Sequence, residues 1–139
     1  MFNKILHAND GSDHAFKALA LGLQITKQNA AELHIVSVEE IPYLPISIEE
    51  IREARAVAAR RFHVAFMHVN AMAAEAGVAF KTHLLVGHPV RTIVDLAGEL
   101  RVDLLVIGAT GHSALYERMV GSRADRIIQL AACPVLVVK

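Results

Sequence analysis

Apolar strand-like segments alternate with longer helix-like segments along this chain, and this alternation limits its fold more than any other feature. Five short runs of apolar and β-branched residues predict strands within residues 2–8, 33–38, 78–86, 103–107 and 135–138. Helical spacing of apolar residues predicts helices beginning at Ser12, from Ser47 to near Gly77, from Pro89 to near Leu100, and over 122–132. Strands joined by long helical connections predict an α/β fold with a parallel sheet. The length of 139 residues predicts one domain, residues 1–139.

Local signals mark several of the helix ends. Ser47 and Glu50 have the spacing of a capping box, in which each side chain bonds the backbone N–H of the other residue. Gly77 suits the position just after a helix, where a left-handed backbone is common. Pro89 suits the first turn of a helix, because its missing N–H would have no helical partner there.

Composition excludes several classes of protein. The hydrophobic fraction is 54%, but no apolar run approaches the ~18 residues of a membrane span. Fourteen Lys and Arg balance fourteen Asp and Glu, so the chain lacks the positive charge of a general nucleic-acid-binding protein. The first residues have no signal-peptide character. Cys133, the one cysteine, is expected to be a small buried hydrophobic side chain, and a cytoplasmic location fits these features.

A glycine-containing segment follows the strand predicted at 103–107. Gly108-Ala-Thr-Gly111 is followed by nine residues and then by Gly121-Ser122, where the last helix is predicted to begin. Glycines there let a phosphate approach the backbone N–H groups of a helix start. The spacing matches neither G-x-x-x-x-G-K-[ST] nor G-x-G-x-x-G, so the two common phosphate-binding loops are excluded.

A second polar turn, Asn9 to Asp13, follows the first predicted strand. In an open α/β sheet, ligands bind beyond the carboxyl ends of the strands, where the strand order reverses. If the first and fourth strands are neighbours, this turn and the glycine-containing segment face one cleft. Asp10 could equally be an Asx-turn residue that only closes the turn.

Residues near the glycine-containing segment also have simpler interpretations. Ser122 could be the N-cap of the last helix, with Asp125 completing a capping-box-like pair, and it could serve a phosphate as well. Arg118 and Arg123 are candidate phosphate ligands, because guanidinium groups bind phosphate oxygens in pairs, or they are solvated surface residues.

The remaining charged residues point to no separate site. The eight histidines lack metal-ligand spacing and are expected to be scattered polar side chains. The charged stretch from Glu49 to Arg61 is expected to be a solvated helix face with Glu/Arg pairs. No G-x-S-x-G segment is present, and no residue is singled out as a catalytic base.

The whole chain resembles the universal stress protein family. Lys4 to Ser12 resembles the first strand and turn of that family, Gly87-His-Pro89 its G-x-P segment, and Cys133 to Val138 its last strand. The spacing G-x2-G-x9-G-[ST] is the signature of its nucleotide-binding branch, and the glycine-containing segment matches it at every position.

This resemblance implies a three-layer α/β/α fold of the adenine nucleotide alpha-hydrolase-like, Rossmann-like type, with strand order 3-2-1-4-5. It implies that Asp10 faces the nucleoside, that the Val38 backbone contacts the adenine, and that Gly111, Gly121 and Ser122 hold ribose and phosphates. The nucleotide is expected to be ATP, or AMP or ADP, and Asp10 is a candidate ligand for Mg²⁺. The full predicted site is Ala8, Asn9, Asp10, Val38, Gly108, Gly111, His112, Gly121, Ser122 and Arg123.

The resulting expectation is a cytoplasmic, ATP-binding universal stress protein that acts as a sensor or switch in the stress response. One alternative is a dimeric interaction module of the same fold that binds no nucleotide, and another is a slow ATPase. A homodimer through the apolar strand Val135 to Val138 is expected, because that strand lies at the sheet edge in the implied order. The protein partner that would receive the signal is not predicted, and neither a membrane nor a nucleic acid is expected as a partner.

Overall fold

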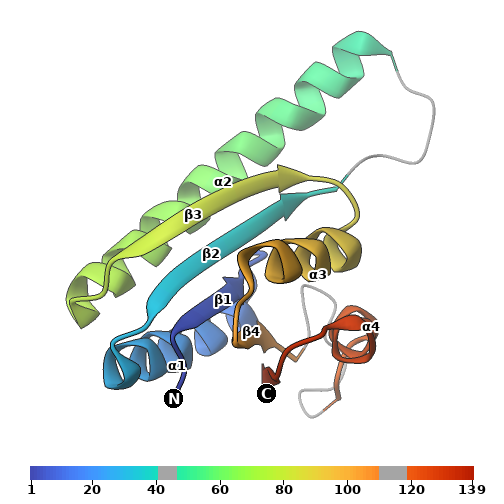
Figure 1. Ribbon diagram of the computed structural model, residues 1–139. Coiled ribbons are helices and arrows are strands. Elements are labelled where there is room, and N and C mark those ends of the chain that lie inside the picture. The colour runs from blue at the N-terminus through green and yellow to red at the C-terminus, as the bar shows by residue number, and fades with distance from the viewer. Residues whose placement is uncertain (41–46, 110–118) are drawn as a thin grey trace.

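The computed structural model describes residues 1–40, 47–109 and 119–139, which form a parallel five-stranded sheet of order β3-β2-β1-β4-β5 with helices on both faces (Figure 1). The elements are β1 (Lys4–Ala8), α1 (Asp13–Asn29), β2 (Glu32–Glu39), α2 (Ile48–Ala76), β3 (Phe80–Val86), α3 (Pro89–Leu100), β4 (Leu104–Gly108), α4 (Ser122–Leu130) and β5 (Val135–Val138). The predicted α/β class, the parallel sheet and the strand order are therefore confirmed.

The two central strands, β1 and β4, are neighbours although about a hundred residues separate them in the sequence. Ile5 lies opposite Leu104, and His7 lies opposite Val106. The strand order reverses at this point. The strands β2 and β3 lie on one side of β1, whereas β4 and β5 lie on its other side. The condition that the first and fourth strands are neighbours is therefore met.

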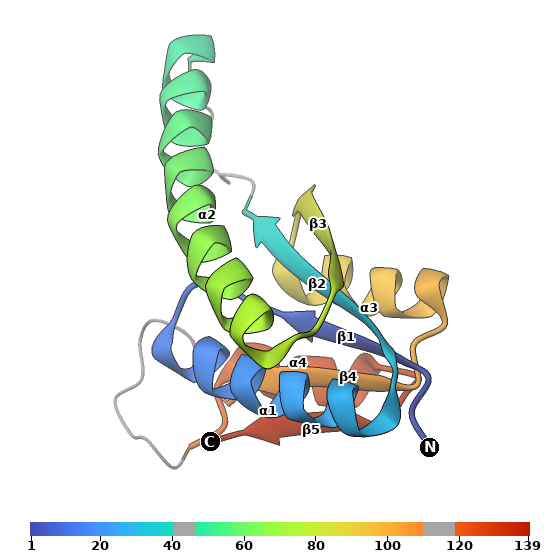
Figure 2. The ribbon, with the colours of Figure 1, turned by 90° about the vertical axis from the view of Figure 1, so that its left-hand side faces the viewer.

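Each face of the sheet carries its own hydrophobic core. Figure 2 shows α2 on one side of the strands and α3 on the other. The first core joins α1 and the C-terminal half of α2 to alternate strand residues, and includes Leu19, Leu23, Ile35, Val69 and Val106. The second joins α3 and α4 to the opposite strand residues, and includes Leu6, Val36, Ile93, Leu105 and Ile127. Because both faces are covered, β4 is apolar without alternation.

The predicted helix ends are largely confirmed. The Ser47 hydroxyl accepts the Glu50 N–H at 3.1 Å, and the Glu50 carboxylate accepts the Ser47 N–H at 3.2 Å, so the capping box forms. Gly77 ends α2 with a φ of 70°, and Pro89 occupies the first turn of α3.

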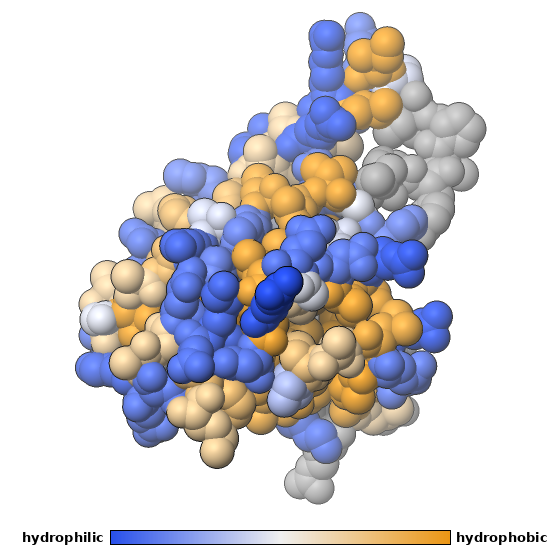
Figure 3. Space-filling model, viewed as in Figure 1, coloured by the Kyte–Doolittle hydropathy of each residue, from blue (hydrophilic) through white to orange (hydrophobic). Residues whose placement is uncertain are grey.

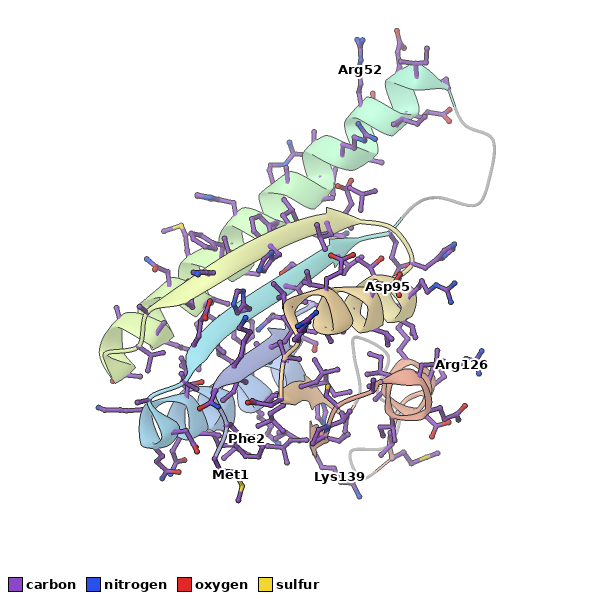
Figure 4. The ribbon with its side chains drawn as sticks, in the orientation of Figure 1. Met1, Phe2, Arg52, Asp95, Arg126 and Lys139 are labelled. Atoms are coloured by element: carbon purple, nitrogen blue, oxygen red, sulfur yellow. The ribbon has the colours of Figure 1, made fainter. Side chains whose placement is uncertain are left out.

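The N-terminal half of α2 extends beyond the sheet. The helix has 29 residues, about 44 Å at 1.5 Å per residue, whereas the seven residues of β3 span about 23 Å. Its buried residues, Val69 and Ala73, lie in its C-terminal half. Figure 3 shows apolar and polar side chains mixed on the projecting end, and Figure 4 shows Arg52 pointing outward there.

The prediction of Glu/Arg pairs along Glu49 to Arg61 is wrong. In the part of the chain that the structure describes, no ion pair within 4.0 Å joins these side chains to one another. The face is solvated as expected. An exposed pair gains little Coulomb energy and restrains two long side chains, so helical spacing alone does not bring such a pair together.

The C-terminal strand is less buried than its sequence predicts. All four residues of β5 are half-buried, although Leu136 and Val138 contact the first core and Val135 and Val137 the second.

Cys133 is also half-buried, and this burial raises the pKa of its thiol. None of the helices among the described residues has the length and apolarity needed to cross a bilayer.

Candidate functional site

A large cleft lies at the carboxyl ends of β1, β2 and β4, where the strand order reverses. Its volume of about 1570 Å³ exceeds the ~300–1,000 Å³ of a typical ligand pocket. The excess arises because the cleft continues into a groove beneath the projecting half of α2. Ile51, Ala58 and Phe62 line this groove on the helix side, and Leu84 and Val86 line it on the β3 side. The space above the strand ends is therefore continuous with a partly apolar surface.

The structure brings the predicted site residues together in this cleft. Eight of the ten lie among its lining residues: Ala8, Asn9, Asp10, Val38, Gly108, Gly121, Ser122 and Arg123. The other two, Gly111 and His112, lie outside the described residues, as does the candidate phosphate ligand Arg118. The eight come from four separate parts of the chain, and only the fold makes them neighbours.

The turn between β1 and α1 is built from side-chain acceptors. The Asp10 carboxylate accepts the Ser12 N–H at 3.0 Å, so the predicted Asx turn at Asp10 forms. The Ser12 hydroxyl then accepts the Ala15 N–H at 3.2 Å and caps α1. Gly11 has a φ of 82°, which a residue without Cβ adopts readily. These bonds place the exposed Asp10 side chain at the cleft.

Gly108 has a packing role in addition to its place in the cleft. A Cβ added there would lie 2.8 Å from the His14 carbonyl carbon, 2.9 Å from its oxygen and 3.1 Å from the Ala15 nitrogen. All three atoms belong to the backbone of the first turn of α1, which cannot move aside as a flexible side chain could. The glycine thus allows α1 to pack closely against the end of β4.

The N-terminus of α4 differs from its predicted form. Gly121 is the N-cap, with extended backbone angles, and no side chain caps this helix. The prediction that Ser122 is the N-cap, paired with Asp125, is therefore wrong by one residue. The Gly121 N–H donates to the Ala109 carbonyl at 2.7 Å, which places Ser122 in the first helical turn. The amides of Ser122 and Arg123 belong to the first turn, where N–H groups have no carbonyl partner within the helix.

Arg123 forms an ion pair across the mouth of the cleft. Its guanidinium contacts the carboxylate of Glu40, the residue that follows β2. Both side chains are about half exposed, so the pair is weakly held and a stronger anion can compete for the arginine. Glu40 was not predicted as a site residue, because nothing in the local sequence pattern links it to Arg123.

Two other histidines form a pair that spacing along the chain did not reveal. The His34 and His83 rings approach to 2.9 Å between Nδ1 and Nε2, and His34 Nε2 lies 2.9 Å from the Glu32 carboxylate. Lys81 also bonds Glu32, and these two bonds lower the pKa of Glu32 to about 2. The prediction of scattered histidines is wrong for this pair, because the β2–β3 register unites residues 49 positions apart. Among the described residues, no three His, Cys, Asp or Glu side chains could together hold a metal ion.

The fold and the position of the cleft define an open, doubly wound α/β protein with a ligand cleft at its switch point. The profile of the universal stress protein family matches residues 1–139. The universal stress protein YxiE of Bacillus subtilis is 36% identical over 151 residues, covering 100% of both chains. This chain therefore belongs to the universal stress protein family.

Solved structures of the family agree with this assignment. Universal stress protein UspA from Lactobacillus plantarum has a TM-score of 0.86 at 27% identity, covering 99% of this chain and 97% of that chain. A universal stress protein solved in complex with cAMP has a TM-score of 0.76 at 26% identity, with the same coverage.

Proposed function

We propose that this protein binds an adenine nucleotide, ATP or its mono- or diphosphate, in the cleft, and acts as a cytoplasmic sensor or switch in the stress response. The observation that carries the proposal is the convergence of eight predicted residues, from four parts of the chain, on one cleft at the switch point. The similar protein solved with cAMP supports an adenine nucleotide as the ligand.

The described residues suit the parts of a nucleotide in different ways. The first-turn amides of α4 suit phosphate oxygens, because N–H groups and the helix dipole point toward an anion there. Arg123 adds a cation beside them if it exchanges Glu40 for a phosphate. The Val38 backbone and the turn at Asp10 line the part of the cleft in which we propose that the nucleoside binds. The Asp10 carboxylate is the proposed ligand for Mg²⁺.

Replacing Gly121 with Val should weaken MgATP binding at least tenfold. The branched side chain would occupy the cleft beside the first-turn amides of α4, where phosphate must approach the backbone closely. The fold should survive, because the φ of −68° and ψ of 163° at Gly121 are open to valine. Isothermal titration calorimetry with MgATP measures the change.

A matched control is Gly98→Val, which adds the same side chain on α3, where a new Cβ would have no described heavy atom within 4 Å apart from its chain neighbours and the backbone of its own helix. This control should bind MgATP like the parent. Equal affinity in the Gly121 variant would contradict the phosphate site, and a parent protein that binds no adenine nucleotide would contradict the proposed function.

We also propose a homodimer through β5, an edge strand of the sheet. The Pro134 carbonyl accepts the N–H of Leu105 in β4, and the Val138 carbonyl accepts the N–H of Ala109, which follows β4. Because successive residues of a strand point their backbone groups to opposite sides, the Val137 N–H points away from β4 toward the open edge. A second copy of β5 could satisfy this donor in a closed two-fold pair.

Val137→Pro should lower the dimer fraction at micromolar concentration by about tenfold or more, because proline removes the outward donor. Val137→Ala is the control, since it trims the same side chain but keeps the N–H. Light scattering coupled to gel filtration measures the mass of each protein. A monomeric parent, or equal dimerisation of the two variants, would argue against the β5 interface.

A further inference from the structure

A buried histidine lies directly beneath the nucleoside side of the cleft. His7, the fourth of the five residues of β1, is fully inaccessible to solvent. Its Nδ1 lies 3.0 Å from the Val106 carbonyl of β4, and its Nε2 lies 3.2 Å from the Asn9 amide nitrogen. A carbonyl oxygen only accepts hydrogen bonds, so Nδ1 carries the proton. In the neutral ring, Nε2 then accepts from the Asn9 NH₂ group.

Asn9 connects this histidine to the turn above it. Its side-chain oxygen accepts the Gly11 N–H at 2.8 Å. Its backbone N–H donates to Val36 at 2.9 Å, and its carbonyl accepts the Ser37 hydroxyl at 2.9 Å. Through Asn9 and His7, the turn after β1 is tied to β2 and β4, the other strands whose ends form the cleft.

The direction of the Asn9 amide depends on the protonation of His7. A charged imidazolium would donate from Nε2, so Asn9 would have to present its oxygen to His7. The NH₂ group would then face the Gly11 N–H, and two donors cannot bond each other. Burial lowers the pKa of His7 to about 4, and the ring is therefore neutral at physiological pH. The hydrogen bond from the Gly11 N–H to the Asn9 oxygen therefore requires a neutral His7 ring.

We propose that His7, acting through Asn9, is a positioning residue that holds the Asp10–Gly11 turn in the conformation that binds the nucleoside. This inference rests on the proposed function. His7 does not line the cleft, whereas Asn9 and Asp10 do. A leucine would fill the space of the ring, but it would leave the Asn9 NH₂ group without its acceptor, free the amide to rotate and release Gly11.

The test compares His7→Leu with His7→Gln. Glutamine places an acceptor near the position of Nε2 and should keep Asn9 in place, whereas leucine cannot. We expect MgATP to bind about tenfold more weakly to the leucine variant and within threefold of the parent to the glutamine variant. Equal weakening in both variants, or in neither, would overturn the proposal.

His34→Leu is the matched control, because it removes a second buried histidine, which bonds Glu32 and His83 outside the cleft. It should leave MgATP affinity unchanged. If His7→Leu does not fold, Asn9→Ala breaks the same connection from its other end and should show the same tenfold loss. Parent-like affinity in a folded Asn9→Ala variant would also overturn the proposal.

Two readouts require no nucleotide, so they separate this inference from the proposed function. Nitrogen NMR of the parent should show His7 protonated at Nδ1 only. Amide exchange at Gly11 should be at least tenfold faster in His7→Leu and parent-like in His7→Gln. If the parent binds no nucleotide, the proposed function fails, and equal Gly11 protection in the two variants would still reject the positioning role.

Discussion

The free energy of unfolding should fall by roughly 3 kcal/mol as the pH decreases from 6.5 to 4, because His7 must stay neutral in the folded protein. Its pKa is lowered from 6.5 to about 4, mainly by burial. Between these values the unfolded chain binds a proton that the folded chain excludes, so stability increases with pH through this range and levels off above it. A difference of about 2.5 pKa units corresponds to roughly 3 kcal/mol at ~1.4 kcal/mol per unit.

Urea unfolding at a series of pH values measures this dependence, and His7→Leu is the control. The variant should lack most of the decrease between pH 6.5 and 4. Burial also lowers the pKa of His83, but that contribution is present in both proteins and cancels in the comparison. Glu32 loses its contribution as pH falls from 4.5 toward its folded pKa of about 2, which overlaps only the lower end of the His7 range, and this loss is also common to both proteins. Parallel pH profiles for parent and variant would show that His7 is not the cause.

Gly108→Ala should destabilise the protein by about 1–3 kcal/mol, the usual cost of forcing an extra carbon into a packed interior. The new Cβ would lie 2.8 Å from the His14 carbonyl carbon, so β4 and the first turn of α1 would have to separate. The measurement is the urea midpoint of the ligand-free protein, which reports packing independently of any phosphate contact.

Gly98→Ala is the matched control for this substitution. Gly98 lies within α3, and apart from its chain neighbours and the backbone of its own helix, a Cβ added there has no heavy atom of the described residues within 4 Å. Alanine should therefore stabilise the helix by up to about 1 kcal/mol, through its higher helix propensity. The same replacement of glycine by alanine is thus expected to lower the free energy of unfolding at Gly108 and to raise it at Gly98. A Gly108→Ala variant as stable as the parent would contradict the close packing of α1 on β4.

Local signals predicted much of the fold. The apolar runs placed the strands to within a few residues, and the last strand, Val135–Val138, was predicted with its observed bounds. The capping box at Ser47 and the helix end at Gly77 were also predicted, because each depends on backbone groups only a few residues away. The N-cap of α4 was misplaced by one residue, since Gly121 and Ser122 both suit that position by type.

Most of the candidate site was predicted as a list of residues, but not as a set of contacts. Glycine spacing and the family resemblance identified Gly121, Ser122 and Asp10 without knowledge of their surroundings. The Glu40–Arg123 ion pair, the His34–His83 pair and the backbone atoms facing Gly108 were all missed. Each of these contacts joins different elements of the fold, so no local pattern contains it.

The sequence by itself determined the parallel α/β class, the approximate strand and helix bounds and the glycine-containing segment, because periodicity and capping depend on near neighbours along the chain. Only the tertiary structure decided that His7 is neutral and bonded to Val106 and Asn9. A pKa depends on burial and on partners contributed by other strands. The tertiary structure likewise assigned Gly108 to helix packing and Arg123 to Glu40, since these contacts exist only once the strands have assembled.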